Sequence, residues 1–229
     1  MTSDARWVWA LAGKHPVVKD YIRIGQGSPL MDDFSKWMEE GYLRVRPAAV
    51  LHSWRFFARG RRKGELSCGL IRDSRDGADR PYPLLIMGWG VLAGWEKDWV
   101  HLPYTLDALW ERIEFVCSRR VFDLEELKRE VLRLGGPSPV ADQSRQGGSP
   151  SCDDIPQRGG MAAARLPGTA DPLDEIVGLL LRMDKPGTAE PEAVFMGGSP
   201  ESSYVAVFSR PLVADDFARL WSMEQGNGM

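Results

Sequence analysis

The sequence predicts an α+β fold in which a mainly antiparallel sheet is flanked by helices in layers. Two observations lead to this expectation. Short extended segments follow one another along the chain and are joined by short polar turns, which is typical of antiparallel pairing. Other stretches carry apolar residues at helical spacing, and such helices need a sheet face on which to bury their apolar side.

The first half of the chain supplies one strand, one helix and three further strands. Residues 6–13 form an aromatic and apolar run ended by a glycine, which favours a buried strand. Ser28 and Pro29 are the residue types of a helix N-cap and first turn, and they predict a helix over 29–46. Three strands are expected to follow, over 54–58, 66–72 and 84–92.

The second half of the chain is richer in helices. Thr105 begins an apolar stripe of helical spacing, and Asp123 with Glu126 has the spacing of a capping box for another helix. The remaining expected elements are a helix after Pro172, a hairpin of strands 193–196 and 204–208, and a helix over 211–223. Because the last hairpin is too small to be stable alone, we expect it to complete the same core.

The chain is expected to form a single domain over residues 1–229 with one flexible insertion at 135–172. A length of 229 residues fits one large domain. The segment 135–172 is dominated by Gly, Pro, Ser and single charges, with few large apolar residues. Such a composition buries too little apolar surface to offset the conformational entropy lost on folding.

Composition is that of an ordinary globular protein, with 43% hydrophobic and 27% charged residues. A formal net charge of −3 gives no general attraction to nucleic acid or to anionic lipid. Cys68, Cys117 and Cys152 lie far apart and form no CxxC pair, which indicates reduced thiols rather than disulfides or a zinc site. No signal peptide is visible, and no apolar run approaches the roughly 18 residues that span a bilayer. We therefore expect a cytoplasmic protein without membrane insertion.

No motif for catalysis, metal binding or a cofactor is visible in the sequence. The pair Gly13-Lys14 departs from a phosphate loop, because Val8 and His15 stand where that loop needs a glycine and a Ser or Thr. The histidines share no ligand spacing, no serine lies in a nucleophile elbow, and no cysteine has an activating partner in view. We expect no enzyme activity, no cofactor and no metal.

Residues 72–80 alternate Asp and Arg around Gly77, directly ahead of the rigid Pro81-Tyr82-Pro83. Such a network can fix the shape of a loop through charge-assisted hydrogen bonds, or the loop can present a recognition surface. Both interpretations stay open from the residues, and the structural one is simpler. The basic group at 59–63 is likewise explained as a solubilising turn or as a site for an acidic partner.

At these motifs the chain resembles the TagF family, also called ImpM, which are accessory proteins of the bacterial type VI secretion system. The resemblance is close over residues 6–95 and looser over the last forty. The positions that carry it are Gly13, Lys14, Pro16, Asp20, Tyr21, Trp37, Gly41, Trp54, Phe56, Ser74, Asp76, Arg80, Tyr82, Pro83 and Leu84. The chain departs from the family pattern at Lys19 and Asp79, where the pattern has glycine.

The resemblance implies a cytoplasmic, longin/SNARE-like sandwich that restrains type VI secretion after translation by protein–protein interaction and has no catalytic activity. The implied partners are other type VI secretion components, among them a forkhead-associated scaffold protein. The candidate partner-binding residues are Lys14, Asp20, Asp76, Arg80 and Tyr82. The residues of the motifs with an expected structural role are Gly13, Pro16, Trp37, Trp54 and Pro83. The alternative is a small enzyme or nucleotide-binding protein that uses Lys14, Asp20, Asp76 and Arg80, should the two loops that carry them meet in one cleft.

Overall fold

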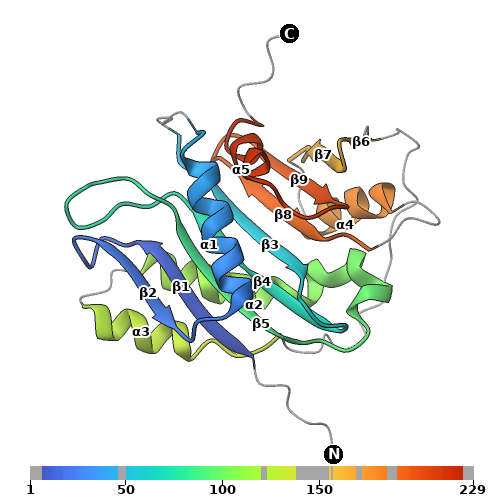
Figure 1. Cartoon of the computed structure of the whole chain (residues 1–229). Helices are drawn as coiled ribbons and strands as arrows, with labels where there is room; N and C mark the ends of the chain where they lie inside the picture. The colour runs from blue at the N-terminus through green and yellow to red at the C-terminus, as the bar shows by residue number, and fades with distance from the viewer. Residues whose placement is uncertain are drawn as a thin grey trace, which may run out of the picture.

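One antiparallel sheet organises the molecule (Figure 1). The computed structural model describes residues 7–45, 50–119, 123–137, 155, 157–168, 172–184 and 190–223. Within these residues nine strands pair in the order β2-β1-β5-β4-β3-β8-β9-β7-β6, and every pair is antiparallel. The strands are β1 Val8–Lys14, β2 Tyr21–Gly25, β3 Ser53–Arg59, β4 Glu65–Arg72, β5 Leu84–Val91, β6 Gln157–Arg158, β7 Met161–Arg165, β8 Ala193–Gly198 and β9 Ser203–Phe208.

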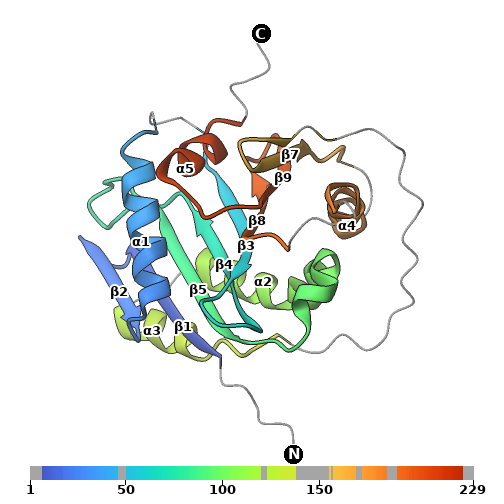
Figure 2. The same cartoon turned by 45° about the vertical axis from the view of Figure 1, so that its right-hand side comes forward.

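Helices cover both faces of this sheet, as the two ribbon views show (Figures 1 and 2). The helices are α1 Pro29–Tyr42, the 3-10 helix η1 Trp95–His101, α2 Leu102–Ser118, α3 Leu124–Leu132, α4 Pro172–Met183 and α5 Ala214–Leu220. The apolar residues of α1 and α5 share one core with one face of the sheet. Those of α2, α3 and α4 share a second core with the opposite face. The predicted layered α+β sandwich with a mainly antiparallel sheet is therefore confirmed.

The central strands are apolar on both faces because both faces are covered. In β3, Trp54 and Phe56 belong to the core under α1 and α5, whereas Phe57 belongs to the core under α2. Phe56 lies opposite Phe195 of β8, and their rings stack at 5.7 Å. This register places β8 and β9 beside β3 in the same sheet as the N-terminal strands, as expected for the last hairpin.

Helices α1 and α3 start where the capping residues predict, whereas several other helix boundaries differ from the expectation. The Ser28 hydroxyl accepts the Met31 N–H at 3.1 Å, and α1 begins at Pro29 but ends at Tyr42, short of residue 46. The Asp123 carboxylate accepts the Glu126 N–H at 2.7 Å at the start of α3. Helix α2 begins before Thr105, because η1 runs directly into it. Helix α5 begins at Ala214 rather than at residue 211.

Strand β2 was not expected, although its residues alternate between buried and exposed as an edge strand requires. Part of the segment 135–172, expected as one flexible insertion, belongs to the sheet. Strand β7 lies within 135–172 and pairs with β9 over its full length. At the other end of this segment, the Trp9 indole donates to the Gly135 carbonyl at 3.1 Å. Residues 138–154 lie outside the described residues.

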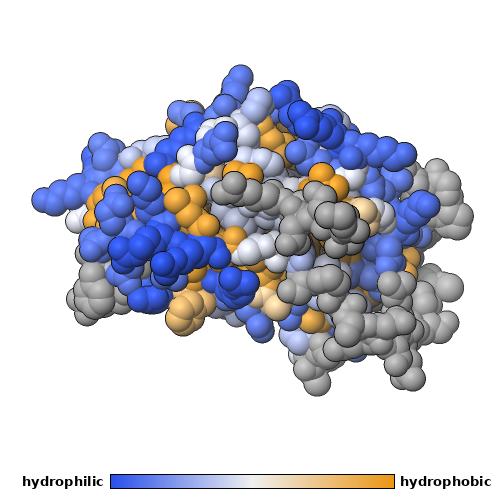
Figure 3. Space-filling view, turned by 90° about the horizontal axis from the view of Figure 1, so that it is seen from below, coloured by the Kyte–Doolittle hydropathy of each residue, from blue (hydrophilic) through white to orange (hydrophobic). Residues whose placement is uncertain are grey.

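The molecular surface seen from below is mixed, with hydrophobic residues exposed between hydrophilic ones (Figure 3). None of the described helices combines the length and the apolarity that crossing a bilayer requires.

Candidate functional site

The two segments that carry the family-like motifs, residues 13–21 and 73–84, meet at one edge of the molecule, and we call them the paired loops. In Figure 1 the connection between β4 and β5 extends outward next to the turn between β1 and β2. Gly13 makes the approach possible, with a φ of +128°. A Cβ at this position would lie 2.1 Å from the Pro83 carbonyl oxygen, so only glycine fits without a shift of the backbone.

The connection between β4 and β5 is itself an extension of the hairpin. Tyr82 donates its N–H to the Ser74 carbonyl at 3.0 Å, and Arg75 pairs with Pro81 as an isolated bridge. The tip turns at Asp79, whose φ of +61° lies in the left-handed region that Asp tolerates better than most residues. The loop therefore has a defined backbone up to its tip.

Asp76 is the centre of this tip. Its Oδ1 accepts the N–H groups of Ala78 at 2.9 Å and of Arg80 at 3.0 Å. Its Oδ2 accepts Arg80 Nε at 2.8 Å and pairs with Lys14 Nζ at 3.2 Å. All four acceptor positions of the carboxylate are thus used, and its side chain has no exposed surface.

The paired loops are also joined through their backbones. Gly77 donates its N–H to the Val18 carbonyl at 2.5 Å, and the Arg80 guanidinium donates to the Lys19 carbonyl. A Cβ on Gly77 would lie 3.0 Å from the Pro16 carbonyl oxygen, which is tighter than ordinary packing. These contacts have no sequence signal, because their acceptors are main-chain carbonyls that every residue carries.

Electrostatics keep the Asp76 carboxylate charged. Burial by itself raises the pKa of Asp76, but the hydrogen bonds from the Arg80 N–H, the Lys14 ammonium, the Ala78 N–H and the Arg80 guanidinium lower it by more. The net pKa lies well below the ordinary value of 3.8. Asp76 is therefore ionised and fully hydrogen-bonded to its neighbours. This arrangement is typical of a structural residue rather than of a general base.

Tyr82 ties the paired loops to α1. Its ring meets Tyr21 of β2 edge-on at 5.7 Å and Tyr42 of α1 at 5.2 Å. Burial, followed by the nearby Tyr21, Glu39 and Tyr42, raises the pKa of the Tyr82 hydroxyl above its ordinary value of 10.0. Tyr21 is 43% exposed, so this aromatic group reaches the surface.

Asp20 stands apart from the Asp76 cluster. It is exposed, and its Oδ1 accepts the N–H of the next residue, Tyr21, at 2.8 Å. The structure thus brings together Lys14, Asp76 and Arg80 of the candidate site and leaves Asp20 on the rim. Exposed charged residues surround Asp76: Lys19, Asp20, Arg75, Asp79 and Arg80.

The motif residues expected to have a structural role differ in burial. Trp37 and Trp54 are 6% and 0% exposed, and the Trp37 indole donates to the Val213 carbonyl at 2.9 Å. Pro83 is buried behind Gly13, whereas Pro16 is exposed. A second polar centre was missed: the Asp73 carboxylate accepts the His52 N–H at 2.8 Å and the Trp221 indole N–H at 2.9 Å.

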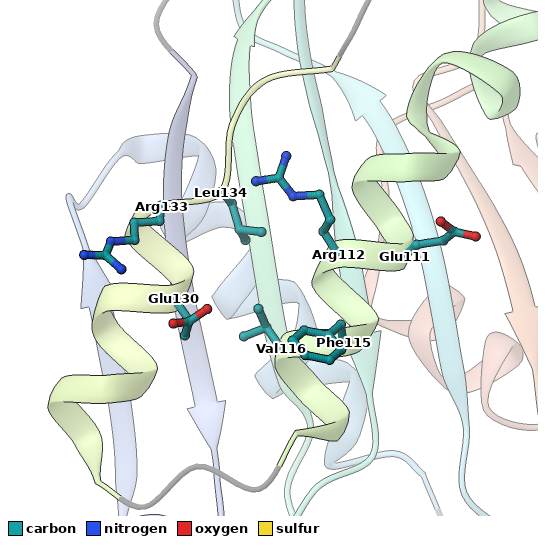
Figure 4. A pocket seen from close by; sticks show the side chains of 7 residues that line it. All are labelled: Glu111, Arg112, Phe115, Val116, Glu130, Arg133 and Leu134. Carbon is teal, nitrogen blue, oxygen red and sulfur yellow. The ribbon is translucent and has the colours of Figure 1, made fainter.

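A pocket of about 250 Å³ lies between α2 and α3, on the face of the sheet opposite to α1 and α5 (Figure 4). We call it the α2–α3 pocket. It is lined by Glu111, Arg112, Phe115, Val116, Glu130, Arg133 and Leu134. None of the candidate site residues lines it. Among the described residues, no group of three or more His, Cys, Asp or Glu side chains is arranged to hold a metal ion.

Comparison with known proteins finds similarity at the level of the fold. No protein-family model matches the chain. No curated protein matches it either. The structure is similar to the crystal structure of PA0076 from Pseudomonas aeruginosa PAO1, with a TM-score of 0.54 and 17% sequence identity over 93% of each chain. At this identity the similarity shows that the two chains share a fold along nearly their whole length.

Proposed function

We propose that this protein is a cytoplasmic accessory protein of a bacterial type VI secretion system, which restrains secretion after translation by binding another component. The observation that carries the proposal is the junction of the paired loops. The residues that resemble the TagF family lie far apart in sequence, yet Lys14, Asp76 and Arg80 meet in one hydrogen-bonded cluster. The cluster supports a protruding loop with exposed charged residues and a half-exposed tyrosine.

Such a surface suits protein recognition. A loop fixed by internal hydrogen bonds loses little conformational entropy when it binds, and Arg and Tyr are frequent anchors of interfaces. The partner that the resemblance implies is a forkhead-associated scaffold protein. The proposed contacts are the exposed rim residues, with Lys14 and Asp76 holding the loop in place.

The geometry favours this function over an enzyme or a nucleotide-binding protein. Lys14 has only 16% of its side chain exposed and its ammonium is paired with Asp76. Asp76 in turn offers no free oxygen to a substrate or cation. A phosphate at this place would have to compete with that ion pair, and Asp20 is not positioned to assist.

The test compares Arg75→Glu, at the tip of the paired loops, with Arg62→Glu, which makes the same charge change at the opposite end of β4. Binding to the purified forkhead-associated scaffold is measured by isothermal titration calorimetry, and folding by thermal melting. We expect Arg75→Glu to weaken binding by about tenfold or more, as loss of an interface anchor does. Both variants should melt like the wild-type protein.

Asp20→Asn serves as a milder change at the rim, with an expected loss of affinity between those of the two arginine variants. Equal binding by Arg75→Glu and Arg62→Glu would show that the paired loops are not the contact surface. Failure of the wild-type protein to bind the scaffold, together with unchanged type VI secretion after deletion of its gene, would contradict the proposed function itself.

A further inference from the structure

The α2–α3 pocket combines an apolar floor with an exposed aromatic wall. Val116 and Leu134 are 5% and 6% exposed and form the floor between the two helices (Figure 4). Phe115 lies beside them and is 63% exposed. Its position in α2 falls outside the apolar stripe that packs on the sheet, so the core does not account for it. Single exposed apolar residues are common on protein surfaces, but this one lines a pocket that also has an apolar floor, as binding sites do.

The charged residues that line this pocket differ in whether they form an ion pair. Glu130 points into the space between the helices, and Arg119 lies 3.7 Å from its carboxylate. Arg112 extends over the pocket toward Leu134, whereas Glu111 points away from it (Figure 4). Among the described residues, no carboxylate lies within ion-pair distance of Arg112 or Arg133, whereas Arg119 pairs with both Glu126 and Glu130. Glu111 also has no ion-pair partner among these residues, so two unpaired arginines and one unpaired glutamate line the pocket. The unmatched charge of the lining is therefore net positive.

The size of the pocket limits what it can hold. At about 250 Å³ it is smaller than the roughly 300–1,000 Å³ typical of small-molecule sites. It has room for one or two bulky apolar side chains, and the open rim allows the rest of a peptide to lie across α2 and α3. An Arg next to such a pocket binds a carboxylate through charge-assisted hydrogen bonds.

We infer that the α2–α3 pocket docks an acidic peptide segment of a partner protein, with a bulky apolar side chain of the segment on Val116 and Leu134. A flanking carboxylate of that segment pairs with Arg112, and Phe115 covers the inserted side chain. This site lies on the opposite face of the sheet from α1, to which Tyr82 ties the paired loops, and its existence does not depend on the proposed function.

The test uses two peptides with the same apolar centre, Asp-Glu-Leu-Phe-Glu-Asp-amide and Lys-Lys-Leu-Phe-Lys-Lys-amide, each labelled with fluorescein at its N-terminal amine. Binding to the full chain is followed by fluorescence anisotropy, and the site is mapped by amide chemical shifts. The acidic peptide should bind saturably and shift the amides of Phe115, Val116 and Leu134. The basic peptide should bind at least about tenfold more weakly, which corresponds to about 1.4 kcal/mol.

Three variants complete the design. Arg112→Glu should lower the affinity for the acidic peptide at least tenfold and raise that for the basic peptide, and Phe115→Ala should weaken both peptides. Arg129→Glu makes the same charge change on α3 outside the pocket and should alter affinity less than about twofold. Equal affinity for both peptides, or equal effects of Arg112→Glu and Arg129→Glu, would overturn the proposal. A wild-type dimer that Phe115→Ala converts to monomer in sedimentation equilibrium would assign the pocket to a second copy and overturn it too.

Discussion

In the paired loops every acceptor position of the Asp76 carboxylate is filled, whereas at the α2–α3 pocket Arg112 has no carboxylate partner among the described residues and Phe115 is mostly exposed. Both regions flank the same sheet, and both present charged residues at the surface. They differ in what their polar groups do. Internal contacts occupy the polar groups that fix the paired loops, whereas Arg112 and Arg133 at the pocket have no carboxylate partner among the described residues.

The difference shows that residue type alone does not tell whether a side chain is buried or available to a partner. Lys14, Asp76 and Arg80 are charged residues in a family-like motif, which makes them candidates for partner contacts. Lys14 and Asp76 are nevertheless mostly buried and form an ion pair with each other. Phe115 has the residue type of a core position and is exposed. Variants that remove the internal contacts of the first region should cost stability, whereas variants of the exposed pocket residues Arg112 and Phe115 should cost binding alone.

The largest effect on stability is expected for Gly13→Ala. The new Cβ would lie 2.1 Å from the Pro83 carbonyl oxygen in a backbone conformation that L residues rarely adopt. We expect the free energy of unfolding to fall by at least about 2 kcal/mol, with loss of the contact between β1 and the start of β5. Urea unfolding of Gly13→Ala and of Gly27→Ala, an exposed glycine without that crowding, measures it. Equal stability of the two variants would refute the close approach of the paired loops.

Asp76→Asn is expected to have the next largest effect. The change keeps the shape of the side chain but places an NH2 group against Lys14 and Arg80, which are donors only. We expect the melting temperature to fall by roughly 5–10 °C, as disruption of a buried network does in a chain of this size. Asp20→Asn makes the same chemical change at the exposed rim and should melt within about 1–2 °C of wild type. A variant at residue 76 that melts like the one at residue 20 would show that the cluster does not hold the loops together.

A smaller effect should appear as acid sensitivity in two steps. Burial and then the nearby Arg72 lower the pKa of His15 below its ordinary 6.5, so its stabilising contribution is complete above pH 6.5 and is lost as the pH falls below that value. The depressed pKa of Asp76 gives a contribution that is complete above its ordinary 3.8 and is lost only as the pH falls further. Melting temperatures from pH 8 to pH 2 measure both.

Each step has its own control. His15→Gln should remove the loss that begins below pH 6.5 and leave the second step unchanged. Asp76→Asn should flatten the curve below about pH 4, since the unfolded-state pKa sets the upper limit of that window. A wild-type protein whose stability rises as the pH falls from 6.5 to 5 would contradict the direction assigned to His15.

Much of the fold follows from the sequence because the signals are local. Ser28 and Asp123 cap their helices as their positions predict, and the strands around the 60–64 turn lie where their apolar runs lie. The missed elements are those for which the decisive contacts are distant. Strand β2 pairs in register with β1, and β7 with β9. The alternation in β2 is only five residues long, and the small residues of β7 show no strand pattern of their own.

The candidate site could be predicted less completely, for two physical reasons. The sequence showed that Asp and Arg alternate around Gly77, which correctly suggested a network, but it could not show that Lys14 from the end of β1 completes it. The sequence also placed Lys14 and Asp76 among the expected contact residues, whereas the geometry favours a structural role for both. Burial of the Asp76 carboxylate depends on where the loop folds back, which the sequence does not show. The α2–α3 pocket had one local signal, the position of Phe115 outside the apolar stripe of α2, and that signal was overlooked.

The smallest effect is expected for Phe115→Ser, and it bears directly on the contrast between the two regions. Because Phe115 is 63% exposed, its removal should change the free energy of unfolding by no more than about 0.5 kcal/mol, as ordinary surface substitutions do. Its neighbour Val116 is 5% exposed, so Val116→Ala should cost about 1–3 kcal/mol through lost burial and the cavity left behind. Urea unfolding of the two variants gives both values on one helix and one pocket. If Phe115→Ser cost as much as Val116→Ala, Phe115 would be packed in solution, the pocket would be closed, and the docking of an acidic segment there would lose its basis.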